Sequence, residues 1–259
     1  MSETTTPPSS TAATSATPAA APARVKPVEY LCTVEHMRML TPTVFETAFE
    51  TDKPLEFKGG QFISIIIPGA GPNGRDLRRA YSIASDPKVR PVELCIKLVE
   101  GGPGTNYLYK LKAGDQFRGL APYGDFVYKT SSTRHAIFIA TGTGIAPFRS
   151  MLLSDAYQGQ KPKSATVLLG VRTEDELLYT ECLAKTEGLK WVSAVSQPTS
   201  AWTGFKGRVT DVMRDPASGI DWLNTDYYLC GNGQMITEIK TLLAEKGVEK
   251  SAIHQEKYY

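Results

Sequence analysis

The stretch LRRAYSIAS, residues 77–85, places two arginines, a tyrosine and a serine at the mouth of an alternating apolar run. A guanidinium binds phosphate oxygens through a planar fork of donors, and a tyrosine ring packs against flat ligands. A strand that only packs needs neither group, so the stretch indicates a binding site for a flat, anionic ligand. The alternative is an edge strand whose basic end is solvated.

Two glycine-rich stretches have the composition of phosphate-binding turns. GGPGTNYLYKL starts at Gly101, after the apolar run VELCIKLV, and its Thr105 could cap a helix or donate its hydroxyl to phosphate. ATGTGIAPF, residues 140–148, follows the apolar run AIFIA and precedes a helical pattern, with Pro147 suited to the first turn. Proline or alanine replaces the later glycine of G-x-G-x-x-G, so this is not that fingerprint. Plain glycine turns before capped helices are the alternative for both.

The elements that must position these residues change character along the chain. Short alternating runs separated by glycine and proline turns fill the first half and predict an antiparallel β-barrel or sandwich. From about His135, strand, glycine turn and helix alternate, which predicts an α/β domain with a parallel sheet. The polar segment 127–134 marks the expected boundary. We therefore predict a tail over residues 1–27, a barrel domain over 28–130 and an α/β nucleotide-binding domain over 131–259.

Composition excludes several classes of protein. The 259 residues are 41% hydrophobic and 22% charged, and no apolar stretch approaches the roughly 20 residues of a membrane span. A net charge of +2 without a long basic run argues against nucleic acid as a partner. The first 27 residues are mostly Ser, Thr, Ala and Pro and lack the pattern of a secretory signal, so we expect a disordered tail, with an organelle transit peptide as the weaker alternative.

The cysteines argue against a metal centre. The chain has four, widely separated and without a C-x-x-C pair: Cys32, Cys95, Cys182 and Cys230. This spacing suits neither zinc nor an iron–sulfur cluster and favours free thiols in a reducing compartment. We expect a cytoplasmic protein without a bound metal.

Taken in order, the motifs resemble those of the ferredoxin–NAD(P)⁺ reductase superfamily over nearly all of residues 28–259. RAYS resembles its flavin motif, GGPGT its flavin-phosphate turn, APYGDF its barrel-closing loop, TGTGIAP and CGNGQM its nicotinamide-nucleotide loops, and EKYY its aromatic carboxyl end. The resemblance implies a barrel domain that binds FAD and an α/β domain that binds NAD(P), without a fused iron–sulfur domain.

The resemblance also implies roles for the residues of the flavin site. Tyr81 is expected against the flavin ring, Arg79 at the pyrophosphate and Ser82 at the flavin nitrogen that accepts hydride. The resemblance implies no role for Arg78, whose side chain is expected to be solvated. The remaining residues expected at FAD are Ala80, Lys97, Gly102, Gly104 and Thr105.

At the nicotinamide, the resemblance places Cys230, for which inert packing is the alternative, and near the flavin edge Glu256, which would manage a proton. Tyr258 is expected to cover the flavin face where nicotinamide must bind, and Tyr259 to reach toward the adenine of FAD. The catalytic set is therefore Ser82, Cys230, Glu256 and Tyr258. The expected NAD(P) loops contain Thr141, Gly142, Thr143, Gly144, Pro147, Cys230, Gly231, Asn232 and Met235.

Two arginines bear on the choice between NADPH and NADH. Arg172 and Arg208 stand where NADPH-using bacterial members of the family place arginines for the extra ribose phosphate, while Gln197 stands where a third would be. The sequence favours NADPH with some use of NADH. Ordinary surface charge is the alternative for both arginines.

The function expected from the resemblance is hydride transfer from NAD(P)H to FAD, followed by single-electron transfer to a separate ferredoxin, flavodoxin or oxygenase component. We expect a monomer with no nucleic-acid or membrane partner. Two alternatives remain open at this point. One is a free-flavin or quinone reductase with the same domains, and the other is a non-catalytic redox sensor subunit.

Overall fold

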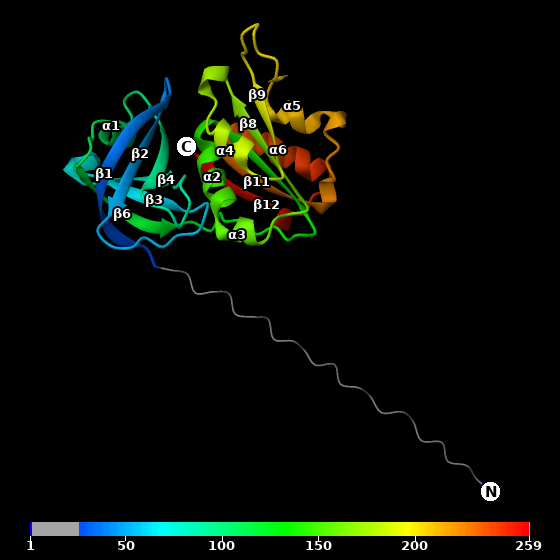
Figure 1. Cartoon of the computed structure of the whole chain (residues 1–259), viewed down its shortest axis with the longest axis horizontal. Coiled ribbons are helices and arrows are strands. Elements are labelled where there is room, and N and C mark those ends of the chain that lie inside the picture. The colour runs from blue at the N-terminus through cyan, green and yellow to red at the C-terminus, as the bar shows by residue number, and fades with distance from the viewer. Residues whose placement is uncertain (2–25, 259) are drawn as a thin grey trace.

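The computed structural model describes Met1 and residues 26–258, which form two six-stranded sheets lying side by side (Figure 1). The first sheet is antiparallel, with the strand order β4-β3-β6-β1-β2-β5. Its strands are β1 (Val28–Thr41), β2 (Val44–Thr51), β3 (Phe62–Ile67), β4 (Leu77–Ser82), β5 (Val92–Lys97) and β6 (Gln116–Tyr123). The short helix α1 (Pro103–Tyr109) lies between β5 and β6 in the chain.

The antiparallel sheet closes on itself. An isolated bridge joins Ile83, directly after β4, to Leu94 in β5, and the amide of Ala84 donates to the carbonyl of Glu93 at 2.8 Å. The interior is filled by inward-facing residues of the strands, including Phe49 and Ile65, which are fully buried. The closed sheet and its shared interior therefore form the predicted barrel.

The second sheet is parallel throughout, with the order β10-β9-β8-β7-β11-β12. Its strands are β7 (His135–Thr141), β8 (Ser164–Val171), β9 (Leu189–Val195), β10 (Phe205–Lys206), β11 (Thr225–Asn232) and β12 (Ile253–Tyr258). Its helices are α2 (Ile145–Leu153), α3 (Asp155–Gly159), α4 (Thr180–Lys185), α5 (Val209–Arg214) and α6 (Gly233–Glu245).

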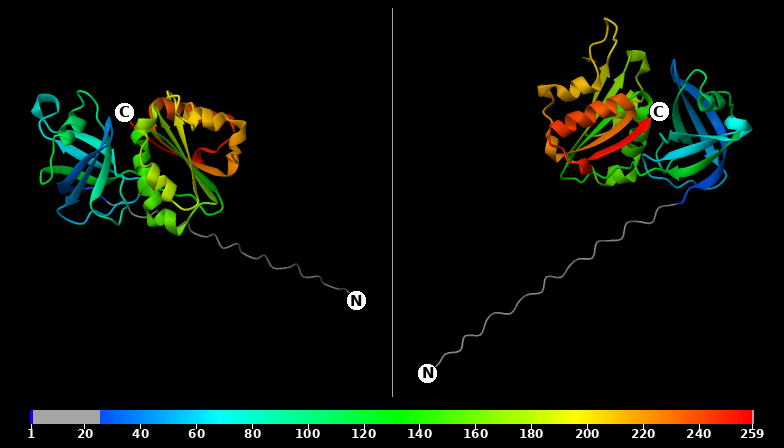
Figure 2. Two further views of the ribbon diagram at one scale, coloured as in Figure 1. Left: turned by 45° about the horizontal axis from the view of Figure 1, so that its top comes forward. Right: turned by 180° about the vertical axis from the view of Figure 1, so that it is seen from behind.

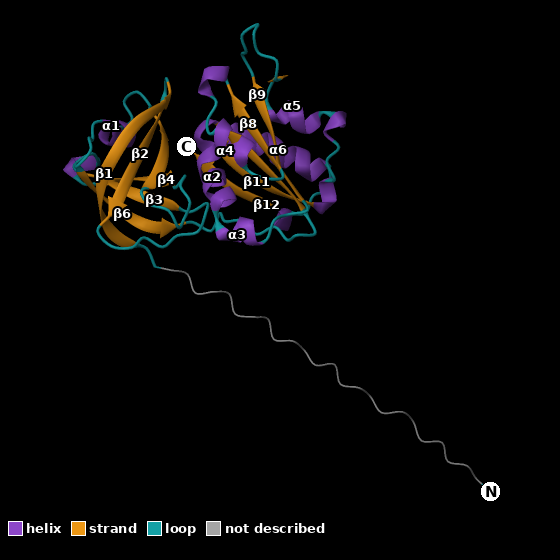
Figure 3. Ribbon diagram, in the orientation of Figure 1, coloured by secondary structure: helices purple, strands orange, loops and turns teal. Residues whose placement is uncertain are grey.

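Helices cover both faces of this sheet (Figures 2 and 3). Along β7, Phe138 packs with Phe148 of α2, whereas its neighbour Ile139 belongs to the cluster that contains Met213 of α5 and Ile239 of α6. The predicted fold class, an antiparallel barrel followed by an α/β parallel-sheet domain, is confirmed. A parallel strand covered on both sides must be apolar on both sides, which is why HAIFIA reads as a continuous apolar run.

Two helical stretches are shorter than the sequence pattern suggests. The stretch that starts at Ile145 divides at Ser154, which has extended backbone geometry and caps α3 by accepting from the amide of Tyr157. In TEDELLYTECLAKT, a 3₁₀ turn over Glu174–Glu176 precedes the six residues of α4. Serine and acidic side chains compete here for backbone amides that a continuous helix would use.

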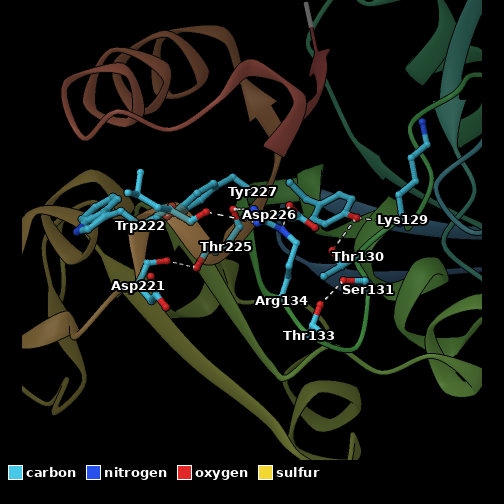
Figure 4. Close-up of polar contacts among 12 residues, drawn as sticks. Lys129, Thr130, Ser131, Thr133, Arg134, Asp221, Trp222, Thr225, Asp226 and Tyr227 are labelled. Carbon is cyan, nitrogen blue, oxygen red and sulfur yellow. Dashed lines mark hydrogen bonds and ion pairs between the residues drawn. The ribbon is translucent and has the colours of Figure 1, made fainter. Parts of the chain in front are cut away.

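The polar segment between the two sheets is fixed to the second sheet (Figure 4). The amide of Lys129 donates to the hydroxyl of Tyr228 at 2.8 Å, and Thr130 lies 3.0 Å from the same oxygen. Arg134 forms an ion pair with Asp226 in β11, with 2.8 Å between Nε and Oδ1, and also donates to the carbonyl of Thr225. The segment that interrupts the sequence pattern is thus anchored along β11.

In the part of the chain that the structure describes, no helix combines the length and the apolar character needed to cross a membrane. The same residues contain no group of three or more His, Cys, Asp or Glu side chains arranged to hold a metal ion. Most of the predicted tail, residues 2–25, lies outside the described residues, and so does Tyr259.

Candidate active site

The two predicted nucleotide loops contact each other at the carboxyl ends of β7 and β11. A Cβ atom on Gly144 would lie 2.3 Å from the carbonyl oxygen of Cys230, and one on Gly231 would lie 2.3 Å from Oγ1 of Thr141. The Thr141 hydroxyl accepts from the amide of Asn232 at 2.8 Å. Because β8 and β11 flank β7 on opposite sides, this is the point where an α/β sheet opens a crevice for ligands.

A cleft of about 620 Å³ lies at this edge of the sheet. Many predicted residues line it, namely Lys97, Thr141, Gly142, Thr143, Arg172, Arg208, Gly231, Asn232, Met235 and Tyr258. Gly144, Pro147 and Cys230 are buried behind the loops. Sequence reasoning missed other lining residues, chiefly Val99, Gly170, Glu176, Ser196, Thr210, Gln234 and Glu238. Gly170 and Ser196 lie at or just after the ends of β8 and β9, and the rule that ligands bind at strand ends would have found them.

The two predicted arginines stand exposed along the cleft while their backbones are held in place. The amide of Arg172 donates to Glu176 at 3.1 Å, and the amide of Arg208 donates to Asp211 at 2.8 Å. Both guanidinium groups are therefore available to a ligand. Among the described residues, Ser196 and not its neighbour Gln197 lines this part of the cleft.

A hydrogen-bonded chain of three side chains joins the barrel to the parallel sheet. The hydroxyl of Tyr258 donates to Oγ of Ser82 at 2.7 Å, and the hydroxyl of Ser82 donates to Oε1 of Glu256 at 2.7 Å. Glu256 and Tyr258 alternate along β12, in register with Cys230 and Asn232 of β11. Three predicted catalytic residues thus meet although Ser82 lies more than 170 residues away in the sequence.

Burial sets the protonation of this cluster. It raises the pKa of Glu256, and the hydrogen bond from Ser82 opposes that rise. Burial also raises the pKa of Tyr258 and of the Cys230 thiol well above their usual ranges, with further contributions from neighbouring acidic groups. Tyr258 and Cys230 are therefore uncharged at neutral pH, and Cys230 lies against Tyr258 in the core and not in the cleft.

The RAYS strand is covered by the start of α1. A Cβ atom on Gly104 would lie 2.4 Å from the hydroxyl oxygen of Tyr81 and 3.0 Å from Cγ of Arg79, so only glycine permits this approach. Burial raises the pKa of Tyr81 to about 12, against a smaller lowering by Arg79. The Arg79 side chain is exposed beside the first turn of α1. A cationic fork and a glycine-lined helix start therefore lie together.

Two details of this region differ from the expectations. Thr105 does not cap α1, because Gly102 occupies the N-cap position and the Thr105 hydroxyl donates back to its carbonyl at 3.2 Å. Arg78 is not simply solvated: its Nε donates to Ser64 at 3.1 Å and its Nη2 to the hydroxyl of Tyr123 at 2.8 Å. Arg78 therefore ties the edge strand β4 to β3 and β6.

Known protein families match both the barrel domain and the α/β domain. Residues 32–128 match the family described as oxidoreductase FAD-binding domain, and residues 138–241 match the oxidoreductase NAD-binding domain. The chain is 32% identical over 234 residues to ferredoxin–NADP reductase B of Sorangium cellulosum, covering 86% of this chain and 94% of that protein. It is 33% identical over 242 residues to the reductase component of phenol 2-monooxygenase of Pseudomonas sp., covering 90% and 67% respectively.

Solved structures show the same fold at lower identity. The ferredoxin NADP⁺ reductase of Neisseria gonorrhoeae with bound FAD and NADP aligns with a TM-score of 0.76 at 20% identity, covering 91% of this chain and all of that chain. The Amycolatopsis cytochrome P450 reductase aligns with a TM-score of 0.79 at 23% identity, covering 89% of this chain and 70% of that chain.

The fold and the two matched domains define a flavin-dependent oxidoreductase that uses FAD and NAD(P). The chain belongs to the ferredoxin–NADP⁺ reductase superfamily. It carries electrons from NAD(P)H through FAD to a partner. The exposed Arg79 lies beside the glycine-lined start of α1, and a cationic fork next to the amides of a helix start has the donor chemistry that suits the anionic part of FAD.

Proposed function

We propose that the protein takes electrons from NADPH, and less efficiently from NADH, and delivers them to a ferredoxin, a flavodoxin or an oxygenase component. The observation that supports this most directly is the chain Tyr258, Ser82 and Glu256, which connects the barrel to β12 beside a cleft with two exposed arginines. We assign the FAD-binding domain to residues 28–130 and the NAD(P)-binding domain to residues 131–259, because β6 ends at Tyr123 and β7 begins at His135.

In this proposal Tyr81 lies against the flavin, and Arg79 with the amides at the start of α1 holds the pyrophosphate. Lys97, at the end of β5, faces the shared cleft. When bound, FAD accepts a hydride, which is two electrons and a proton, from NAD(P)H, leaving NAD(P)⁺, and passes the electrons on singly. The protein supplies alignment and no obligatory acid, base or nucleophile.

The residues at the carboxyl end manage access and protons. Tyr258 lines the cleft and is tied to Ser82, so the nicotinamide must displace its ring before reaching the barrel side. Burial raises the pKa of Glu256, which favours the protonated carboxyl, and its Oε1 accepts from the Ser82 hydroxyl, so we assign this carboxyl group to holding a proton at the flavin edge. Cys230 supports Tyr258 from behind as a neutral thiol.

The preference for NADPH rests on Arg172 and Arg208, which line the cleft and can form charge-assisted bonds with a ribose phosphate. Glu176 and Glu238 also line the cleft. Their carboxylates oppose an added phosphate dianion, which is the physical reason to expect NADH to be used as well.

The acceptor is proposed from the names of the relatives, which are a ferredoxin–NADP reductase and reductase or electron transfer components of oxygenases. The first test measures FAD per chain from the absorbance spectrum. The protein is then titrated with NADPH and with NADH. Finally, the rates at which it reduces a ferredoxin, free FMN and a quinone are compared. We expect one FAD per chain and the fastest turnover with the protein acceptor. FMN or quinone as the preferred acceptor would contradict the proposal, and absence of flavin would reject it.

A further inference from the structure

Helix α2 connects the cleft to the barrel. It starts directly after the turn Gly142–Gly144, whose Gly142 and Thr143 line the cleft, and it is the helix that faces the barrel in Figures 1 and 2. One turn into this helix, Nη1 of Arg149 donates to the carbonyl of Ala84 at 2.9 Å and to Oε2 of Glu93 at 2.5 Å. A single side chain thus reaches from the nucleotide-loop helix to two segments of the barrel.

Both partners of Arg149 adjoin the flavin side of the site. Ala84 comes two residues after Ser82, and Glu93 lies in β5, whose last residue Lys97 lines the cleft. The bridge between Ile83 and Leu94 holds these two segments together. The guanidinium therefore contacts the barrel where the strand of Tyr81 and Ser82 ends.

A second contact fixes α2 immediately beyond Arg149. A Cβ atom on Gly59 would lie 2.6 Å from the carbonyl oxygen of Ser150 and 2.8 Å from Cα of Met151. Gly60, with a φ of +99°, approaches the carbonyl oxygen of Phe126 so closely that its Cβ would lie 2.0 Å away. The turn before β3 therefore packs backbone to backbone against α2, a contact that leaves no room for a side chain.

Tyr179 completes the surroundings of Arg149. Its ring lies 4.7 Å from the guanidinium carbon, and its backbone adopts the left-handed region with a φ of 56°. Its buried hydroxyl lies beside the thiol of Cys95 in β5. A left-handed backbone is unusual for a tyrosine, and here it places the Tyr179 ring over the guanidinium group of Arg149.

The arrangement is not the one that maximises stability. Nε of Arg149 is buried and has no hydrogen-bond partner among the described residues. The surrounding contact is apolar and spans both halves, with Ala84, Cys95 and Phe126 of the barrel packed with Phe148 and Met151 of α2. An apolar side chain at position 149 would suit such a contact, but apolar packing is not directional and permits sliding, whereas a charge-assisted hydrogen bond fixes register.

We propose that Arg149 is a positioning residue for hydride transfer: by binding Ala84 and Glu93 it fixes the loop Thr141–Gly144 relative to the strand that carries Tyr81 and Ser82. This rests on the roles proposed above for that loop and that strand. Hydride transfer requires the donor and acceptor atoms to be held within a fraction of an ångström, and displacement by about 1 Å costs on the order of 100-fold in rate.

The test compares Arg149→Met, Arg149→Lys and Glu93→Gln with the wild-type holoenzyme. Measured for each are FAD per chain, the melting temperature, the Kd for NADP⁺, the NADP⁺-induced absorbance change of the flavin, and the anaerobic rate of flavin reduction at saturating NADPH. Arg134→Met is the matched control, because it also removes a paired arginine, but one whose partner Asp226 lies within the parallel sheet (Figure 4).

We expect Arg149→Met to keep its FAD, its melting temperature and a Kd for NADP⁺ within about threefold, while the reduction rate falls about 10- to 100-fold. The NADP⁺-induced absorbance change, which reports stacking and not turnover, should weaken in parallel. Arg149→Lys should recover part of the rate, because an ammonium keeps the charge but not the fork. The reduction rate of Glu93→Gln should lie between the rates of wild type and Arg149→Met.

A reduction rate within twofold of wild type in Arg149→Met and in Glu93→Gln would overturn the proposal. So would a rate loss matched by loss of FAD or of thermal stability, since the residue would then be merely structural. If Arg149→Met does not fold, the near-isosteric Glu93→Gln decides alone by the same criteria. Failure of the proposed function looks different, because the wild-type protein would then lack flavin or would not be reduced by NADPH.

Discussion

The two proposed nucleotide sites differ in how much of their structure exists before a ligand arrives. On the barrel side, Gly104 already packs on Tyr81, and Ser82 is already bonded to Glu256 and Tyr258. In the α/β cleft, Arg172 and Arg208 have exposed side chains on backbones that are held in place. Ordering such a side chain costs up to about 2 kcal/mol of rotamer entropy. The first site is suited to a cofactor that stays bound, and the second to a coenzyme that must exchange.

The largest effect should come from breaking the preformed site. Gly104→Ala places a Cβ atom 2.4 Å from the Tyr81 hydroxyl, so α1 must move away from the strand and the anion cradle opens. We expect FAD affinity to fall at least 100-fold, which removes roughly 2.7 kcal/mol of ligand stabilisation under conditions that saturate the wild type. Flavin absorbance per chain and the melting temperature measure this.

Gly159→Ala is the matched control, since a Cβ atom there meets nothing within 4 Å. It should retain full FAD and melt within a degree or two of wild type. Full flavin occupancy and an unchanged melting temperature in Gly104→Ala would show that α1 plays no part in holding FAD.

The next effect should fall on the exchangeable ligand alone. Arg172→Ala and Arg208→Ala each remove a proposed donor for the ribose phosphate, and a hydrogen bond to a charged group contributes about 1.5–3 kcal/mol. The Kd for NADPH should therefore rise about 10- to 100-fold, while the Kd for NADH and the FAD content stay near wild type. Calorimetric or spectral titration with both coenzymes tests this.

Arg79→Ala is the converse variant and should lose FAD without changing the ratio of NADPH to NADH affinity. The comparison between the two sites fails if the Arg172 and Arg208 variants lose flavin, or if both coenzymes weaken equally. Arg214→Ala controls for loss of positive charge, because Arg214 lies in the last turn of α5 and does not line the cleft.

The same difference between the sites explains what the sequence revealed. Glycine turns after apolar runs identify the loops at Gly142 and Gly231 because backbone conformation and close approach leave a local signature. The cleft residues Glu176, Ser196 and Glu238 leave none, since an exposed polar side chain looks like any surface residue until the sheet order brings the strand ends together.

The errors have equally local causes. Thr105 resembles an N-cap by residue type, but α1 begins at Pro103 and Gly102 is its N-cap. Arg78 reads as a solvated charge and is exposed, yet it also bonds Ser64 of the preceding strand β3 and Tyr123 of β6. Such pairings depend on strand order and register, which a motif does not contain.

A third prediction concerns the residue that belongs to both sites. Tyr258 lines the cleft and donates to Ser82, so nicotinamide binding must break that bond and move the ring. Tyr258→Ser removes this cost, and NADP⁺ should bind several-fold to 10-fold more tightly with a stronger charge-transfer band. Turnover need not rise, because tighter ground-state binding slows release.

The same variant should narrow the preference for NADPH over NADH, since an open site favours the nicotinamide ring that both coenzymes share. Tyr259→Ser should change NADP⁺ affinity little on this account, although Tyr259 lies outside the described residues. A large effect at Tyr259 with none at Tyr258 would mean that the motif is displaced by one residue.

The smallest expected effect tests whether Glu256 carries the raised pKa that its burial implies. Burial raises this pKa above the usual 4.5, so the unfolded chain releases the proton at lower pH than the folded chain does. At a pH between the pKa of the unfolded chain and the higher pKa of the folded chain, unfolding releases a proton. The free energy of unfolding must therefore fall as pH rises through this range. Glu256→Gln cannot titrate, so the melting temperature of the variant minus that of wild type should rise from pH 4.5 upward and level off once the folded carboxyl has ionised. A change of about 1–2 °C is the scale expected for a protein of this size.

The comparison requires equal FAD content in both proteins, and the exposed Glu187→Gln controls for loss of one negative charge. A difference that stays flat or falls with pH would mean that the bond from Ser82 outweighs burial at Glu256.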